Sequence, residues 1–116
     1  EIMQLGFDRS NAISTVQKME AEGIECVAIK QHSSVLHPAT KLLKECVLKR
    51  TFVYDENRLL EINIQNARCT EDTNLNKYVN KKKSAGKVDM VVAVINALYL
   101  LQLELISRET DFVIQT

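Results

Sequence analysis

The segment that decides the fold runs from residue 2 to residue 29 and reads IMQLGFDRSNAISTVQKMEAEGIECVAI. Two short runs of mostly apolar residues, 2–7 and 24–29, predict a strand at each end of the segment. The residues between them predict a helix. A strand, a helix and a strand in this order form a βαβ unit, which implies a parallel strand pair and therefore an α/β sheet.

The predicted helix inside this unit has recognisable ends. Ile13, Val16 and Met19 stand at helical spacing and define its apolar face. Ser10 is placed to cap the start of this helix, and Gly23 is placed to end it. The first strand then ends at Asp8, immediately before the helix.

Further elements are predicted along the rest of the chain. They are a loop at 31–37, a second helix from Pro38, a short edge segment at 51–54, a third helix capped by Asp55 or Asn57, and a hairpin within 68–86 that turns near 71–74. From Lys87 a long helix is expected, apolar nearly all round through Leu105 and packed on more than one side. The tail after Ser107 is expected to be peripheral.

The composition is typical of one soluble globular domain. The chain has 116 residues, of which 46% are apolar and 26% charged. Lys plus Arg equals Asp plus Glu at 15 each, so any contact with nucleic acid must come from a local basic patch. The three cysteines form no CxxC pair and indicate reduced thiols in a cytosolic protein, without a disulfide framework or a zinc site. No secretory signal opens the chain.

The most apolar stretch, residues 88–106, approaches the length of a membrane span. It contains Asp89, Asn96, Gln102 and Glu104, which are expensive in hydrocarbon. A buried core helix is therefore the preferred interpretation, and no membrane partner is expected.

Two aspartates are the candidate catalytic and metal-binding residues. Asp8 follows a predicted strand, where ligand-binding groups collect in parallel sheets, and Asp89 opens the long helix. Taken singly, each is more simply a cap or a favourable charge at a helix start. Together they can meet at one sheet edge, where carboxylates about 4 Å apart repel by roughly 4 kcal/mol at an effective dielectric near 20. A proton or a divalent cation relieves this repulsion, and oxygen ligands suit Mg²⁺ or Mn²⁺.

A basic segment precedes Asp89 and is the candidate DNA-binding feature. Its lysines are Lys77, Lys81, Lys82, Lys83 and Lys87. Such a segment is commonly a solvated loop. Its place just before Asp89 favours contact with a phosphate backbone, without readout of base sequence. His32 and His37 lack a base partner or ligand spacing, so an ordinary surface role is expected for both.

Two stretches resemble the signature motifs of the phage terminase large subunit family. They are GFDRSNA, from Gly6 to Ala12, and KSAGKVDMVVA, from Lys83 to Ala93. Between them, the strand start at residues 23–24 and the segment PATKLL at 38–43 fall in the family's order. The resemblance covers nearly the whole chain.

The resemblance implies a fold, an activity and partners. The fold would be a partial nuclease domain similar to RNase H, with a central, mostly parallel sheet flanked by helices. Asp8 would be the acid after the fourth strand and Asp89 the acid on the last helix, holding two Mg²⁺ or Mn²⁺ ions that hydrolyse phosphodiesters. Such an enzyme cuts concatemeric phage DNA during packaging in the bacterial cytoplasm. Its partners would be double-stranded DNA, the portal and the small terminase subunit.

The chain departs from the family's pattern at its front. The opening strands, with their leading catalytic aspartate, should lie before Glu1, and the ATPase motor has no counterpart in residues 1–116. This single, truncated nuclease domain is therefore expected to cleave DNA weakly or not at all by itself, and its exposed sheet edge could drive homo-oligomerisation. Two alternatives stay open: another nuclease of the RNase H type, such as a resolvase or transposase, and a non-catalytic module that binds DNA or a partner.

Overall fold

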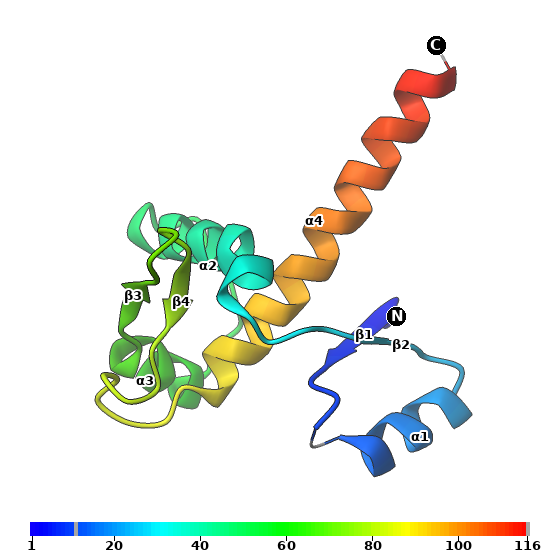
Figure 1. Ribbon diagram of the computed structural model, residues 1–116. Coiled ribbons are helices and arrows are strands. Elements are labelled where there is room, and N and C mark those ends of the chain that lie inside the picture. Colours follow the sequence, from blue (N-terminus) through cyan, green and yellow to red (C-terminus); the bar gives the residue numbers. More distant parts are fainter. Residues whose placement is uncertain (11, 116) are drawn as a thin grey trace.

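The computed structural model describes the backbone of residues 1–10 and 12–115 and the side chains of residues 1–10 and 12–110. Helices and strands both occur, and the long last helix runs through the centre of the molecule and out to the C-terminus (Figure 1). In chain order the elements are β1 (Gln4–Phe7), α1 (Ile13–Ala21), β2 (Glu25–Ala28), α2 (Ser33–Leu48), α3 (Arg58–Asn66), β3 (Cys69–Glu71), β4 (Lys77–Val79) and α4 (Asp89–Gln115).

The βαβ unit predicted from residues 2–29 is present. β1 and β2 pair in parallel, with Gln4 opposite Glu25 and Phe7 opposite Ala28. Gly23 ends the α1 segment with a φ of 83°, a left-handed conformation that favours glycine. The prediction of an α/β fold with a parallel strand pair is therefore confirmed.

The predicted cap of α1 was wrong. The N-cap residue of α1 is Ala12, and no side chain among the described residues caps this helix. The Ser10 hydroxyl instead donates to Asp8 Oδ1 at 3.0 Å, and the Ser10 N–H donates to the same oxygen at 3.2 Å. Ser10 therefore closes a turn onto the aspartate rather than starting the helix.

The loop predicted at 31–37 is largely helical. α2 begins at Ser33, and Pro38 lies inside it rather than in its first turn. His32 caps the helix, because its ring Nδ1 accepts the N–H of Ser34 at 3.1 Å. Proline inside a helix removes one backbone hydrogen bond. The first turn of α2 is nevertheless held by this cap and by contacts with the β3–β4 hairpin, and the local sequence does not reveal the hairpin contacts.

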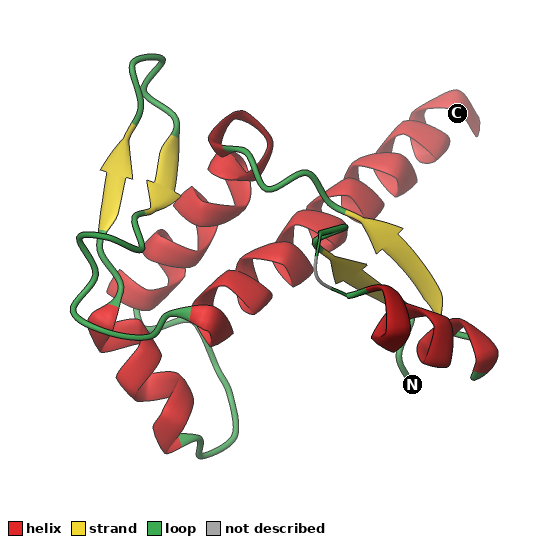
Figure 2. Cartoon of the chain, turned by 60° about the horizontal axis from the view of Figure 1, so that its bottom comes forward, coloured by secondary structure: helices red, strands yellow, loops and turns green. Residues whose placement is uncertain are grey.

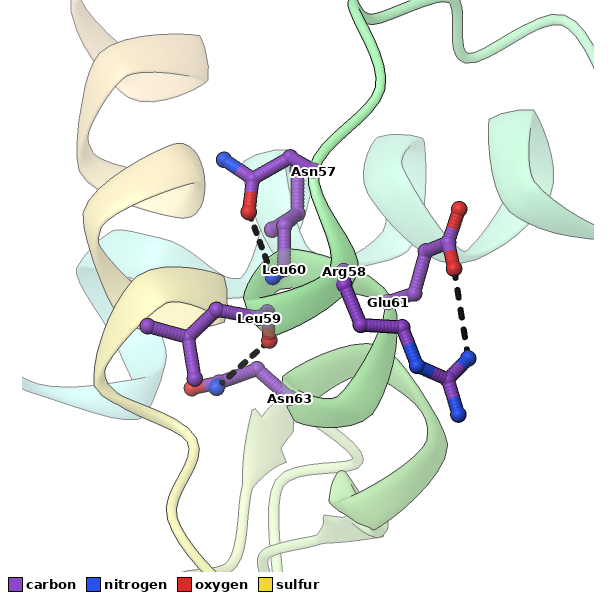
Figure 3. A network of polar contacts seen from close by, with 6 residues as sticks. All are labelled: Asn57, Arg58, Leu59, Leu60, Glu61 and Asn63. Carbon is purple, nitrogen blue, oxygen red and sulfur yellow. Dashed lines mark hydrogen bonds and ion pairs between the residues drawn. The ribbon is translucent and has the colours of Figure 1, made fainter.

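Asn57 caps α3, which was one of the two predicted possibilities. Its side-chain oxygen accepts the Leu60 N–H at 2.9 Å, and Arg58 lies 3.5 Å from Glu61 on the same helix (Figure 3). Between α2 and α3, residues 51–54 form no strand, so the edge segment predicted there was wrong.

The predicted hairpin is confirmed. β3 and β4 pair antiparallel, with Cys69 opposite Val79, and they form a two-stranded sheet separate from the β1–β2 pair. Figure 2 shows the two strand pairs on opposite sides of α4. Asp72 makes the turn, since its Oδ1 accepts the backbone N–H groups of Asn74 and Asn76, each at 2.9 Å.

The first half of α4 is the centre of the core. Val91 and Ile95 are buried against Ala39 and Leu43 of α2. On the other side, Gly6 of β1 approaches so closely that an added Cβ would collide with Ile29 Cδ1 and lie 3.1 Å from Leu100 Cδ1. α4 therefore packs between α2 and the parallel strands, as expected for this half.

The second half of α4 differs from the prediction of a buried core helix. By length and composition alone, the stretch Asp89–Thr110 could span a membrane, and 17% of its most apolar window is buried. Core helices of soluble proteins share this length and composition, but they are mostly buried. The exposed large apolar side chains of the distal half are Leu101, Leu103, Leu105 and Ile106. The tail after Ser107 continues the helix to Gln115.

Candidate functional site

A cavity of about 310 Å³ opens at the carboxyl ends of the two parallel strands. Open α/β sheets bind their ligands at this position, because side chains from several strand ends converge there. Five parts of the fold line it. Asp8 follows β1, Gln31 and His32 follow β2, and Ser33, Leu36 and Thr40 come from α2. Tyr78 and Lys81 come from β4 and the loop after it, and Val92 and Asn96 come from α4.

Asp8 is exposed and lies at this cavity, as its place after the first strand predicted. The two hydrogen bonds from Ser10 to its Oδ1 leave Oδ2 without a hydrogen bond to the described residues. One carboxylate oxygen thus orders the turn, and the other is available to a ligand.

Asp89 is the first residue of α4, and α3 fixes its position from both sides. The Nδ2 of Asn66 donates to the carbonyl oxygen of Lys87 at 3.1 Å, and the Oδ1 of Asn63 accepts the N–H of Met90 at 3.2 Å. Asn63 is almost fully buried. The side chain of Asp89 itself is exposed, so it is free to contact a ligand while its backbone is held.

Asp8 lines the cavity, whereas Asp89 is not one of the residues that line it. Asp89 shares a helix face with Val92 and Asn96, which line the cavity. At a rise of about 1.5 Å per residue, it begins the helix roughly 4–5 Å before Val92 along the axis. In residues 1–10 and 12–110, no three side chains of His, Cys, Asp or Glu form a metal-binding group. The described residues therefore place one acid, Asp8, at the cavity and a second, Asp89, one helical turn before it on α4, without a complete set of metal ligands.

The five predicted DNA-binding lysines lie in different surroundings. Lys81 lines the cavity together with Asp8. Lys82, Lys83 and Lys87 are exposed outside it. Lys77, by contrast, lies in β4 and forms an ion pair with Glu71 at 2.7 Å, which raises the pKa of Lys77 and lowers the pKa of Glu71. Lys81 thus lines the same cavity as Asp8, whereas Lys77 is paired with Glu71.

The lysine loop, residues 80–88, is ordered by side-chain hydrogen bonds. Asn80 Oδ1 accepts the N–H groups of Lys82 and Lys83, each at 3.1 Å. The Ser84 hydroxyl donates to the Asn80 carbonyl at 2.7 Å and accepts the Arg68 N–H at 3.1 Å. These bonds present the lysines in a defined arrangement and not as an unstructured solvated segment.

Two side chains of α2 hold the hairpin beside the cavity. The Ser33 hydroxyl donates to Asp72 Oδ2 at 2.5 Å, and His37 Nδ1 accepts the N–H of Lys77 at 2.8 Å. The hydrogen bond from Ser33, with further bonds from Asn76 and Asn74, lowers the pKa of Asp72 to about 2. His32 and His37 thus have structural roles as a cap and an acceptor, and His32 also lines the cavity.

Sequence reasoning missed Gln31, Tyr78 and Asn96 as residues of this site. Gln31 follows a predicted strand end, which is the same positional signal that singled out Asp8. Asn96 is a polar residue in an apolar stretch, and it is buried at 9% exposure. No sequence pattern marks Tyr78 as a site residue, because its position at the cavity depends on how the hairpin packs against α2.

The fold and the cavity define an α/β domain in which an acid and a lysine converge at the ends of parallel strands. Residues 1–104 match the family "Terminase large subunit, endonuclease domain", and the chain belongs to this family. Among solved structures, the chain is similar to that of the HK97 bacteriophage large terminase, with 22% identity and a TM-score of 0.73. The match covers 86% of this chain and 21% of that one, and it shows a shared fold. No curated protein is significantly similar in sequence.

Proposed function

We propose that this chain contributes to a DNA endonuclease site in which Asp8 and Asp89 hold a divalent cation and the lysine loop binds the DNA backbone. The observation that carries the proposal is the shared cavity of Asp8 and Lys81 at the ends of β1 and β2. An acid and a lysine that line one cavity suit a phosphodiester, because the lysine attracts the phosphate and the acid holds the cation that neutralises it.

The donors present suit magnesium or manganese. Both candidate ligands, Asp8 and Asp89, are exposed carboxylates. Mg²⁺ retains several waters and commonly takes only one or two protein carboxylates, so two acids fit such an ion without a closed cage. When bound, the ion would supply the charge that orients and activates water against a phosphodiester.

The residues of this chain divide the remaining tasks. Lys81 would contact the phosphate nearest Asp8, and Lys82, Lys83 and Lys87 would contact phosphates farther along the strand. Because these contacts go to the backbone, they position double-stranded DNA without reading its sequence. Lys77 would contribute less, since its ammonium group is already paired with Glu71.

DNA binding tests the lysine assignment. The variant Lys81→Gln/Lys82→Gln/Lys83→Gln is compared with Lys18→Gln/Lys41→Gln/Lys49→Gln, a triple variant of exposed lysines outside the loop. Affinity for a DNA duplex is measured by fluorescence anisotropy at several salt concentrations. The slope of log affinity against log salt should fall by about 0.9 for each phosphate that the first variant no longer neutralises, and should stay unchanged in the second. Equal effects of the two variants would refute the assignment.

Cleavage tests the acids. The longest natural form of the protein is incubated with plasmid DNA and Mn²⁺, with EDTA as the metal-free control. Asp8→Asn and Asp89→Asn should each abolish nicking and linearisation, whereas Asp55→Asn, which changes an exposed aspartate between α2 and α3, should retain both. Cleavage that survives both site substitutions would exclude these acids from catalysis.

A second candidate function is a non-catalytic module that binds DNA. The hydrogen bonds from Ser10 to Asp8 favour it, since they give that acid a structural role in a turn. In that case metal binding would not depend on Asp8 or Asp89, while the effect of the lysine variant would remain.

The remaining partners follow from the family. As part of a terminase large subunit acting in the bacterial cytoplasm, the chain would work with the portal and the small terminase subunit. β1 pairs with β2 alone among the described strands, so its other edge is open to a strand of a second copy. Light scattering across a concentration series tests this self-association.

A further inference from the structure

A buried asparagine in an otherwise apolar helix carries a further inference. Asn96 is 9% exposed, its Nδ2 donates to the Val92 carbonyl at 3.1 Å, and its Oδ1 accepts from Gln31 Nε2 at 2.8 Å. A buried amide costs desolvation that its hydrogen bonds only offset, so an apolar residue would serve packing at least as well. The asparagine therefore points to a role other than packing.

Gln31 connects this asparagine to the strand that leads to Asp8. Its Nε2 also donates to the Ile29 carbonyl at 3.1 Å. The N–H of Ile29 in turn donates to the Phe7 carbonyl at 2.8 Å, which extends the β1–β2 ladder to the residue before Asp8. A continuous set of hydrogen bonds thus runs from the backbone beside Asp8, through Gln31, to Asn96 on α4.

On the helix side, Asn96 lies two turns beyond Asp89. Residues seven apart in an α-helix point to nearly the same side. A hydrogen bond at Asn96 therefore fixes the rotation of α4 about its own axis. It also fixes the position of α4 along that axis relative to the carboxyl ends of β1 and β2. The apolar contacts around it, such as those of Ile95, are less directional, because apolar packing has no preferred hydrogen-bond geometry.

We propose that Gln31 and Asn96 are positioning residues that set the separation between Asp8 and Asp89. This proposal rests on the proposed function, since the separation matters only if the two acids share a cation. Gln31 and Asn96 act through the elements that carry the acids and do not ligate the cation. Substitution of residues that orient metal ligands without binding the metal typically lowers metal affinity 10–100-fold. A loss of this size is expected here.

A double-mutant cycle tests the bridge between Gln31 and Asn96. Gln31→Met and Asn96→Leu remove the amides while nearly keeping size, and Gln17→Met on the exposed side of α1 is the matched control. Mn²⁺ affinity is measured by calorimetry for both single variants and the double variant. Each single variant should bind about tenfold more weakly, the double variant no more weakly than either single, and the control like the unchanged chain. Additive losses, or no loss, would overturn the proposal.

A metal-free measurement separates this proposal from the proposed function. In ¹⁵N-labelled protein without metal, Gln31→Met and Asn96→Leu should each shift the amide signals of both Asp8 and Asp89, and Gln17→Met should shift neither. If the unchanged chain bound no Mn²⁺ while these shifts occurred, the bridge would stand as a structural link and the metal site would fall. If only the signals near each substitution moved, the positioning role would be refuted whatever the metal data show.

Discussion

The Oδ1 of Asn63 in α3 accepts the backbone N–H of Met90, the second residue of α4, at 3.2 Å. A side chain of one helix thus serves as the N-terminal cap of another, directly beside Asp89. Because Asn63 is almost fully buried and also bonds to the Leu59 carbonyl, this cap has little freedom to move (Figure 3). α3 therefore helps to fix the start of α4.

Asn63→Ala should destabilise the protein by about 1–2 kcal/mol, because it removes the cap of α4. Urea unfolding followed by circular dichroism measures this change. Asn74→Ala, in the exposed turn of the hairpin, is the control and should cost much less. A loss equal to that of the control would mean that the Asn63 cap contributes nothing.

Gly6→Ala should cost about 1–3 kcal/mol through overpacking, because the new Cβ would collide with Ile29 Cδ1. The change is again measured by urea unfolding. In an Ile29→Val background, which lacks that methyl group, the same substitution should cost clearly less. Equal costs in both backgrounds would contradict the close approach of Gly6 to Ile29.

Gly86→Ala should disturb the lysine loop without unfolding the protein. The added Cβ would lie 2.8 Å from Asn66 Nδ2, so Asn66 must move and its bond to the Lys87 carbonyl must weaken. DNA affinity measured by anisotropy should fall. In an Asn66→Ala background the steric conflict is gone, and the glycine substitution should have no further effect on affinity. A further loss of DNA affinity in the Asn66→Ala background would mean that Gly86 acts other than through Asn66.

Acid should weaken the attachment of the hairpin to α2. The pKa of Asp72 is lowered from its ordinary 3.8 to about 2, chiefly by the hydrogen bond from Ser33. Its contribution to stability is therefore complete above pH 3.8 and is lost as the pH falls toward 2. Asp72→Asn should be less stable than the unchanged chain at neutral pH, and the difference should narrow below pH 3.8. A difference that is constant with pH would exclude this carboxylate as the cause.

The parts of the fold that were predicted correctly depend on local chemistry. Gly23 ends a helix through its backbone freedom, and Asn57 caps α3 through its own side chain. The wrong start of α2 involves contacts between distant residues. α2 begins before Pro38 partly because Ser33 and His37 bond to the hairpin, about forty residues away. No local pattern contains that information.

The same distinction applies to the site. Asp8 was predictable because a strand end marks its position, and the structure places it at the cavity with Lys81. The pairing of Lys77 with Glu71 depends on the register of the hairpin, which the sequence left open. Gln31 and Asn96 lie 65 positions apart, so their hydrogen bond could be found only in the folded chain.

The proposed function requires that Asp8 and Asp89 hold one divalent cation. The most direct test is a calorimetric Mn²⁺ titration at neutral pH and low salt of this chain, Asp8→Asn, Asp89→Asn and the control Asp55→Asn. We expect the unchanged chain and the control to bind Mn²⁺, and each of the two site variants to lose at least about tenfold in affinity. Binding that is absent from the unchanged chain, or equal in all four proteins, would contradict it.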